Sequence, residues 1–287
     1  MADCDSKLSC ENDRILVFKK NGYLIWDCKK CDYRFAQIDD KLTHVSKVYS
    51  DDYFFNGKDG YPNYLDEKDI LYKHGLYYAN LLSKYSIPAR ILDVGSAAGF
   101  ILKAFEDQGW ECIGLEPNET MAIYGRNVLN LDIQTGNLES FKTDQKFDLI
   151  SLIQVIGHFY NVDKAFQNIH QLLHPSGLVL VESWNMNSWI ARLFGRYWHE
   201  YSPPSVINWF SDKSLIRFFD NFGFEMIDSG HPVKQINLKH ALSLLEKDSP
   251  ANSVKRKLID SLKNSFGKFV INYPPTDLKW YVFRKKS

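Results

Sequence analysis

Long apolar segments are missing from this chain of 287 residues. No run of 18 apolar residues occurs, so the sequence holds no candidate transmembrane helix. The N-terminal segment MADCDSKLSC lacks the apolar stretch that secretory signal peptides carry. We therefore expect a cytoplasmic protein that has no membrane partner.

Net charge is missing as well. Thirty-five Lys and Arg residues balance 35 Asp and Glu residues, which argues against a large phosphate-binding surface and hence against nucleic acid as a partner. Internal repeats and low-complexity segments are also absent. With 45% hydrophobic and 15% aromatic residues, the chain can bury one main core and a small second unit.

Cysteine is scarce, yet four of the five cysteines lie within the first 31 residues. Cys28 and Cys31 have zinc-knuckle spacing, and in a reducing compartment such a cluster favours thiolate metal ligands over disulfides. Two short apolar runs flank Asn21-Gly22, a preferred hairpin turn. This hairpin would gather Cys4, Cys10, Cys28 and Cys31 around one structural zinc ion. The alternative is a hairpin whose cysteines bind no metal, because five residues separate Cys4 from Cys10 where a zinc knuckle has two.

The segment 90–119 has the pattern of a βαβ unit. A short apolar strand ends at Val94, a turn of small residues spans 95–99, a helix begins at Phe100, and a second apolar strand ends at Glu116. Such a unit presents backbone N–H groups and a helix N-terminus to a nucleotide-like ligand.

Two carboxylates flank this turn. Asp93 lies two residues before Gly95, and Glu116 follows 23 residues after Asp93. The dinucleotide fingerprint GxGxxG is missing, because Gly95 and Gly99 are four residues apart. Asp93 would repel a pyrophosphate but attract an ammonium group, and Glu116 can accept hydrogen bonds from two ribose hydroxyls. The alternative is a tight turn that binds no ligand.

These residues together resemble the first motif of the class I S-adenosylmethionine-dependent methyltransferases, usually hydrophobic-hydrophobic-Asp-x-Gly-x-Gly-x-Gly, with Ala97 at the middle glycine. The resemblance implies an α/β fold with a doubly wound, mostly parallel, seven-stranded Rossmann-like sheet. It also implies S-adenosylmethionine as cofactor, with Asn137 where relatives often place an Asp for the adenine amino group. The implied cofactor-binding residues are Asp93, Gly95, Ala97, Gly99, Glu116, Pro117, Asn137, Leu138, Gln154 and Tyr53.

The N-terminal part resembles the zinc-ribbon leader found before one subgroup of these methyltransferases. This resemblance implies a cysteine-rich leader at 1–48, an aromatic and helical cover segment at 49–86, and a methyltransferase domain at 87–287. The cover segment, including Tyr53, is expected at the methionine end of the cofactor. An insertion at about 185–210 is expected to form the acceptor pocket, or else a buried aromatic plug.

A histidine base is expected for a hydroxyl acceptor, because an imidazole with an ordinary pKa of about 6.5 can take the hydroxyl proton. His199 is the first candidate, since Glu200 and Tyr201 beside it could orient it or hold the acceptor. His158, just past the predicted fourth strand, is the second, and transfer without a base is the third possibility. No acidic pair precedes His158, so a catalytic metal is not expected.

We therefore expect methyl transfer from S-adenosylmethionine to a small-molecule acceptor. An oxygen of a sugar, a glycolipid precursor or a secondary metabolite is the first choice, because the resembled subgroup often accompanies such pathways. Two alternatives stay open at this point. The leader could recruit RNA or a protein as the substrate, or the domain could bind the cofactor and only regulate.

Overall fold

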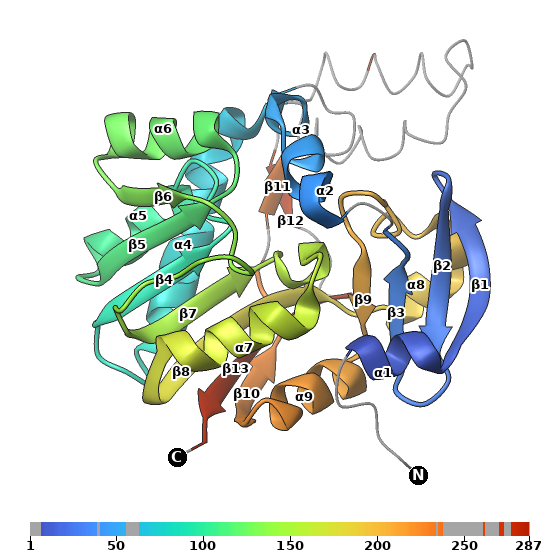
Figure 1. The fold of residues 1–287 in the computed structure, drawn as a ribbon. Coiled ribbons are helices and arrows are strands. Elements are labelled where there is room, and N and C mark those ends of the chain that lie inside the picture. The colour runs from blue at the N-terminus through green and yellow to red at the C-terminus, as the bar shows by residue number, and fades with distance from the viewer. Residues whose placement is uncertain are drawn as a thin grey trace.

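The computed structural model describes residues 7–38, 41–55, 63–233, 235–237, 261, 270–272 and 277–286. Its main element is a seven-stranded sheet in which five neighbouring strands pair in parallel and a sixth strand at one edge is separated from them by a single antiparallel strand (Figure 1). The doubly wound, mostly parallel sheet implied by the resemblance is thereby confirmed. In spatial order the strands are β10 (Phe224–Gly230), β13 (Leu278–Lys285), β8 (Leu173–Trp184), β7 (Phe147–Ile153), β4 (Arg90–Val94), β5 (Glu111–Glu116) and β6 (Asp132–Thr135).

Helices cover both faces of this sheet, because successive side chains of its central strands point to opposite faces. On β4, Leu92 belongs to one hydrophobic cluster and Ile91 to the other. The covering helices are α7 (Val162–Leu172) and α9 (Asp212–Asn221) in the first cluster, α4 (Lys68–Leu82) and α5 (Phe100–Asp107) in the second, and α6 (Glu119–Leu129) next to β6 (Figure 1).

A second, four-stranded antiparallel sheet contains the N-terminal residues. Asn21 and Gly22 form its first turn with φ values of 49° and 87°, as a two-residue hairpin loop requires. The fourth strand comes from the insertion at 185–210, where Phe210 pairs with Tyr33. Leader and insertion therefore share one sheet (Figure 1). Its elements are β1 (Arg14–Lys20), β2 (Tyr23–Cys28), β3 (Tyr33–Ala36) and β9 (Asn208–Phe210), with α1 (Lys7–Asn12) beside β2.

Short elements complete the described chain. Residues 235–237 and 270–272 pair as a two-stranded sheet of their own. No described helix has the length and apolar character needed to cross a membrane. The division into leader, cover segment and methyltransferase domain stays a prediction. The remaining elements are α2 (Lys41–Val48), α3 (Asp51–Phe55), η1 (Tyr64–Glu67), η2 (Ile156–His158), α8 (Trp189–Phe194), η3 (Gly195–Tyr197), β11 (Gln235–Asn237) and β12 (Val270–Asn272).

Candidate active site

A cavity of about 410 Å³ opens where the parallel strands β4, β5 and β7 end. Its volume lies within the range of small-molecule sites, and its position matches the carboxyl edge at which open α/β sheets bind ligands. Gly99 is the one predicted cofactor residue outside its lining. The predicted residues that do line it are Asp93, Gly95, Ala97, Glu116, Pro117, Asn137, Leu138, Gln154 and Tyr53.

The turn after β4 is held by residues with positive φ. Ala97 has a φ of 48°, a conformation that glycine adopts more readily, which accounts for the glycine that relatives carry there. Gly99 has a φ of 85°, and a Cβ on it would lie 2.6 Å from a methyl carbon of Leu131. Gly99 therefore serves the packing of the turn against its neighbours, outside the cavity itself.

Glu116 ends β5 with its carboxylate facing this turn. Its Oε2 accepts a hydrogen bond from the Ala97 N–H at 2.8 Å, and its Oε1 accepts one from the Asn118 N–H at 2.8 Å. Only 2% of Glu116 is exposed. Burial raises its pKa to about 7, although both backbone hydrogen bonds act in the opposite direction.

Asp93 is the second buried acid of the cavity. Its Oδ1 accepts a hydrogen bond from the Ser151 hydroxyl at 2.6 Å, and burial raises its pKa to about 7. Among the described residues, neither Asp93 nor Glu116 forms an ion pair with a basic side chain. A ligand that brings positive charge and hydroxyl groups would stabilise both carboxylates, and S-adenosylmethionine carries both.

The far end of the cavity differs from the sequence expectation in one detail. The Asn137 Oδ1 accepts hydrogen bonds from the Ser140 N–H at 3.1 Å and from the Ser140 hydroxyl at 2.9 Å. The oxygen expected to face adenine is thus engaged within its own turn. Glu139, which the sequence analysis missed, lines the same region, and burial raises its pKa to about 7.

The cover segment is tied to the end of β5. The Asn118 side-chain amide donates to the Tyr49 carbonyl at 3.0 Å and to the Asp51 carboxylate at 3.0 Å. Tyr53, four residues after Tyr49, packs edge-on against the Tyr49 ring with centroids 5.4 Å apart. The structure therefore brings Tyr53 to the cavity, where its ring forms part of the wall.

His158 lines the cavity, but its ring is already engaged. Its Nδ1 lies 2.8 Å from the Ser205 carbonyl oxygen and 2.8 Å from the Tyr49 hydroxyl. Because a carbonyl oxygen can only accept, Nδ1 carries a proton. Burial lowers the pKa of His158 to about 4, so this ring is neutral at neutral pH and a weak base.

The structure does not bring His199 and Tyr201 to the cavity. His199 lies edge-on to Trp184 with ring centroids 4.8 Å apart, and its Nε2 is 3.3 Å from a Glu200 carboxylate oxygen. Tyr201 is buried in the core under the leader sheet, where it packs edge-on against Trp198.

The insertion as a whole therefore takes a place other than the expected acceptor pocket. All residues 185–210 are described, and none lines the cavity. Trp198, Tyr201 and Trp209 fill the core beneath the leader sheet instead, since burying such rings against that sheet removes more apolar surface from water than covering an open cleft would. This arrangement corresponds to the aromatic plug.

Besides Glu139, two further residues near the cavity were missed by the sequence analysis. His74 of α4 lines the cavity, and its ring contacts Glu182 of β8. Each had a sequence signal. His74 and Tyr78 share one helix face at a spacing of four residues, and Glu182 is a charge at the end of the apolar run LVLV, where an unpaired acid would be costly.

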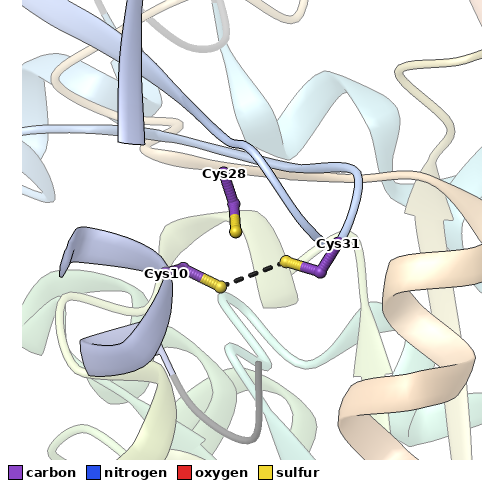
Figure 2. Close-up of side chains that lie close together, drawn as sticks. All are labelled: Cys10, Cys28 and Cys31. Atoms are coloured by element: carbon purple, nitrogen blue, oxygen red, sulfur yellow. Dashed lines mark hydrogen bonds between the residues drawn. The ribbon is translucent and has the colours of Figure 1, made fainter. Parts of the chain in front are cut away.

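Three cysteines converge at the base of the leader sheet (Figure 2). The sulfur atoms of Cys10, Cys28 and Cys31 all lie within 4.8 Å of one another, and all three residues are buried. The 3.1 Å between the sulfurs of Cys10 and Cys31 exceeds a disulfide bond length of about 2.0 Å. Cys4, the fourth predicted ligand, lies outside the described residues.

Sequence comparison relates this chain to methyltransferases. The profile described as "Methyltransferase domain" matches residues 72–229. The ubiquinone biosynthesis O-methyltransferase of Rickettsia typhi is 28% identical over 152 residues, which cover 51% of this chain and 58% of that protein. That of Bradyrhizobium diazoefficiens is 22% identical over 147 residues, covering 44% and 58%. The chain thus spans little more than half the length of these relatives.

Solved structures show the same fold. The YcgJ protein of Bacillus subtilis superposes with a TM-score of 0.53 at 20% identity, covering 75% of this chain and 99% of that one. The 1,6-didemethyltoxoflavin-N1-methyltransferase of Burkholderia thailandensis, solved with 1,6-didemethyltoxoflavin and S-adenosylhomocysteine, gives a TM-score of 0.53 at 14% identity and covers 90% and 98%. With the profile match across more than half its length, the chain belongs to the methyltransferase domain family, as a class I S-adenosylmethionine-dependent member.

Proposed function

We propose that this protein transfers a methyl group from S-adenosylmethionine to an oxygen atom of a small molecule. The observation that carries the proposal is the pair of buried acids, Asp93 and Glu116, that face one cavity without a basic partner among the described residues. The bound cofactor supplies an electrophilic methyl group on a sulfonium. The chain supplies the cofactor-binding site, aligns the acceptor and excludes water.

Each of the main cofactor-binding residues has a role in this proposal. Glu116 holds the ribose hydroxyls, Asp93 attracts the ammonium group of the methionine part, and Gly95 and Ala97 allow close backbone approach. Asn137 and Leu138 lie at the adenine end. Tyr53 would contact the methionine part.

Two observations support a small acceptor that reacts through oxygen. The cover segment forms part of the cavity wall, with aromatic side chains such as Tyr53 and Tyr77, and a concave site of this kind suits a compact molecule better than a macromolecule. Curated relatives carry the name O-methyltransferase. Sugars, glycolipid precursors and secondary metabolites are the acceptor classes that we propose.

The proposal is tested with methyl-deuterated S-adenosylmethionine and a cell extract of small molecules. We expect mass spectrometry to find a labelled product, with the label on an oxygen by fragmentation. Glu116→Ala, incubated in parallel, should yield little of it. Label found only in RNA or protein would favour the leader-recruited substrate, and cofactor binding without any labelled product would favour the regulatory alternative.

We also propose that the leader binds one structural zinc ion through Cys10, Cys28 and Cys31, with Cys4 as the fourth ligand. The chemistry of the donor set fits, because buried thiols in close contact become stable thiolates when a zinc ion binds them. The Lys30 N–H donates to the Cys28 sulfur at 3.4 Å, which would stabilise a thiolate. Four sulfur ligands leave no open position for catalysis.

A further inference from the structure

A carboxylate without any exposed surface lies behind the cavity. Glu182 of β8 is 0% exposed, and side chains of His74, Tyr78 and Gln154 contact it. Its Oε1 accepts from the Gln154 amide at 2.6 Å. Its Oε2 lies 2.7 Å from the His74 Nε2 and accepts from the Tyr78 hydroxyl. Side chains from α4 and from just past the end of β7 thus converge on this one carboxyl group.

Glu182 and its contacts lie at a different place along the sheet edge from the proposed cofactor-binding residues. Glu116 and Asp93 stand at the ends of β5 and β4, whereas Glu182 lies opposite Ile153 at the end of β7. Strand order runs β8, β7, β4, β5. A cofactor bound over β4 and β5 therefore leaves the β7 and β8 side of the cavity, with His74 and Gln154, for the acceptor.

The ring of His74 presents one nitrogen to the cavity. Because a carboxylate can only accept, the Nε2 facing Glu182 carries the proton, and the Nδ1 keeps its lone pair. Nδ1 has no hydrogen-bond partner within the described part of the chain and is not among the fully buried unpaired atoms. It therefore opens into the cavity that His74 lines.

The orientation of this ring is fixed by packing. Tyr77 lies nearly parallel to it, at 14° with centroids 6.3 Å apart, and Tyr78 lies edge-on at 4.8 Å. The next residue, Gly75, lets α4 pack closely against α5, since a Cβ there would lie 2.6 Å from the Ile101 carbonyl oxygen. The histidine is thus held by a carboxylate, by two rings and by close helix contact.

We propose that His74 is the general base that takes the acceptor's hydroxyl proton, and that Glu182 is the residue that orients it. This rests on the proposed transfer to oxygen. In that step the C–O bond forms, the C–S bond of the sulfonium breaks, sulfur leaves as a neutral thioether, and the hydroxyl proton moves to the His74 Nδ1. Glu182 stabilises the resulting imidazolium, while Gln154 and Tyr78 hold Glu182.

The Glu182→Gln variant separates an orienting role of Glu182 from a purely structural one. In Glu182→Gln, the new amide can donate to Nε2, so the ring should carry its proton on Nδ1 and lose its basic nitrogen toward the cavity. Nitrogen NMR of the imidazole ring reads this tautomer directly and needs no acceptor. In the wild type we expect a protonated Nε2 and an unprotonated Nδ1, and in Glu182→Gln the reverse.

Turnover is measured with catechol and methyl glucoside as hydroxyl probes, and with aniline and thiophenol as nitrogen and sulfur probes. His74→Gln should lower kcat on a hydroxyl probe by about a hundredfold or more, the usual contribution of a general base, with KM and S-adenosylhomocysteine affinity nearly unchanged. His174→Gln, an exposed histidine at the start of β8, is the matched control and should match wild type.

The outcomes distinguish this inference from the proposed function. Wild-type kcat in His74→Gln on a hydroxyl probe would overturn the base assignment and leave transfer to oxygen standing. Transfer by the wild type to aniline or thiophenol alone would overturn transfer to oxygen, and the base with it. A wild-type ring protonated on Nδ1 would overturn the base assignment whichever probe reacts. Unchanged S-adenosylhomocysteine binding shows that each variant is folded.

Discussion

Cofactor binding should depend on pH through the Glu116 carboxyl. Burial raises its pKa to about 7, so in the cofactor-free protein this group still binds a proton at pH 6. Holding two ribose hydroxyls favours the ionised form. Binding therefore releases a proton, and the affinity falls as the pH drops below 7.

The size of the effect follows from the same value. For one group with a pKa of about 7, S-adenosylhomocysteine should bind about tenfold more weakly at pH 6 than at pH 8, which is about 1.4 kcal/mol. Asp93, whose pKa burial also raises to about 7, acts in the same direction. If both acids ionise on binding, the affinity at pH 6 should be at most about a hundredfold weaker than at pH 8.

Isothermal titration calorimetry in two buffers of different ionisation enthalpy measures both the affinity and the protons released. Glu116→Gln should bind at least tenfold more weakly at pH 8 and show a smaller pH dependence. Glu111→Gln changes an exposed acid on the same strand and should behave as wild type. Equal or tighter binding at pH 6 by the wild type would refute the assignment of Glu116 to the ribose.

Metal analysis of protein purified without chelator should find about one zinc per chain, and Cys31→Ser should lose it; no zinc would refute the site. S-adenosylhomocysteine should raise the melting temperature and NAD should not. Gly22 and Gly99 both have φ near +86°, but of the two only Gly99 has side chains close to where a Cβ would lie. Gly22→Ala should lower the free energy of unfolding by roughly 1 kcal/mol, and Gly99→Ala should lower it several-fold more. Since burial lowers the pKa of His158 to about 4, its share of the stability is lost as the pH falls from about 6.5 to 4, and His158→Gln should flatten that loss.

The parts of the fold that the sequence predicts are those set by local signals. The apolar runs, the small-residue turn and the acids at 93 and 116 all lie within one segment of about 30 residues, so their spacing alone specifies a βαβ unit. The hairpin at Asn21-Gly22 is equally local. In each case the residues that form the contact are neighbours in the chain.

The parts that escaped prediction depend on contacts between distant residues. His74 and Glu182 are 108 residues apart, and nothing in either local pattern shows that α4 crosses the end of β8. The pairing of β9 with β3 likewise joins Phe210 to Tyr33. Polar residues in the insertion suggested an acceptor pocket, yet Trp198 and Trp209 determine its position, because their burial completes the core beneath the leader sheet.

The crystal structure of the protein with S-adenosylhomocysteine tests the central claim most directly. The account predicts ribose hydroxyls within hydrogen-bonding distance of Glu116, the amino group beside Asp93, and the sulfur directed toward the side of the cavity that holds Gln154 and His74. A cofactor bound outside this cavity, or one lying in it with the adenine toward His74 and the ribose away from Glu116, would contradict the account.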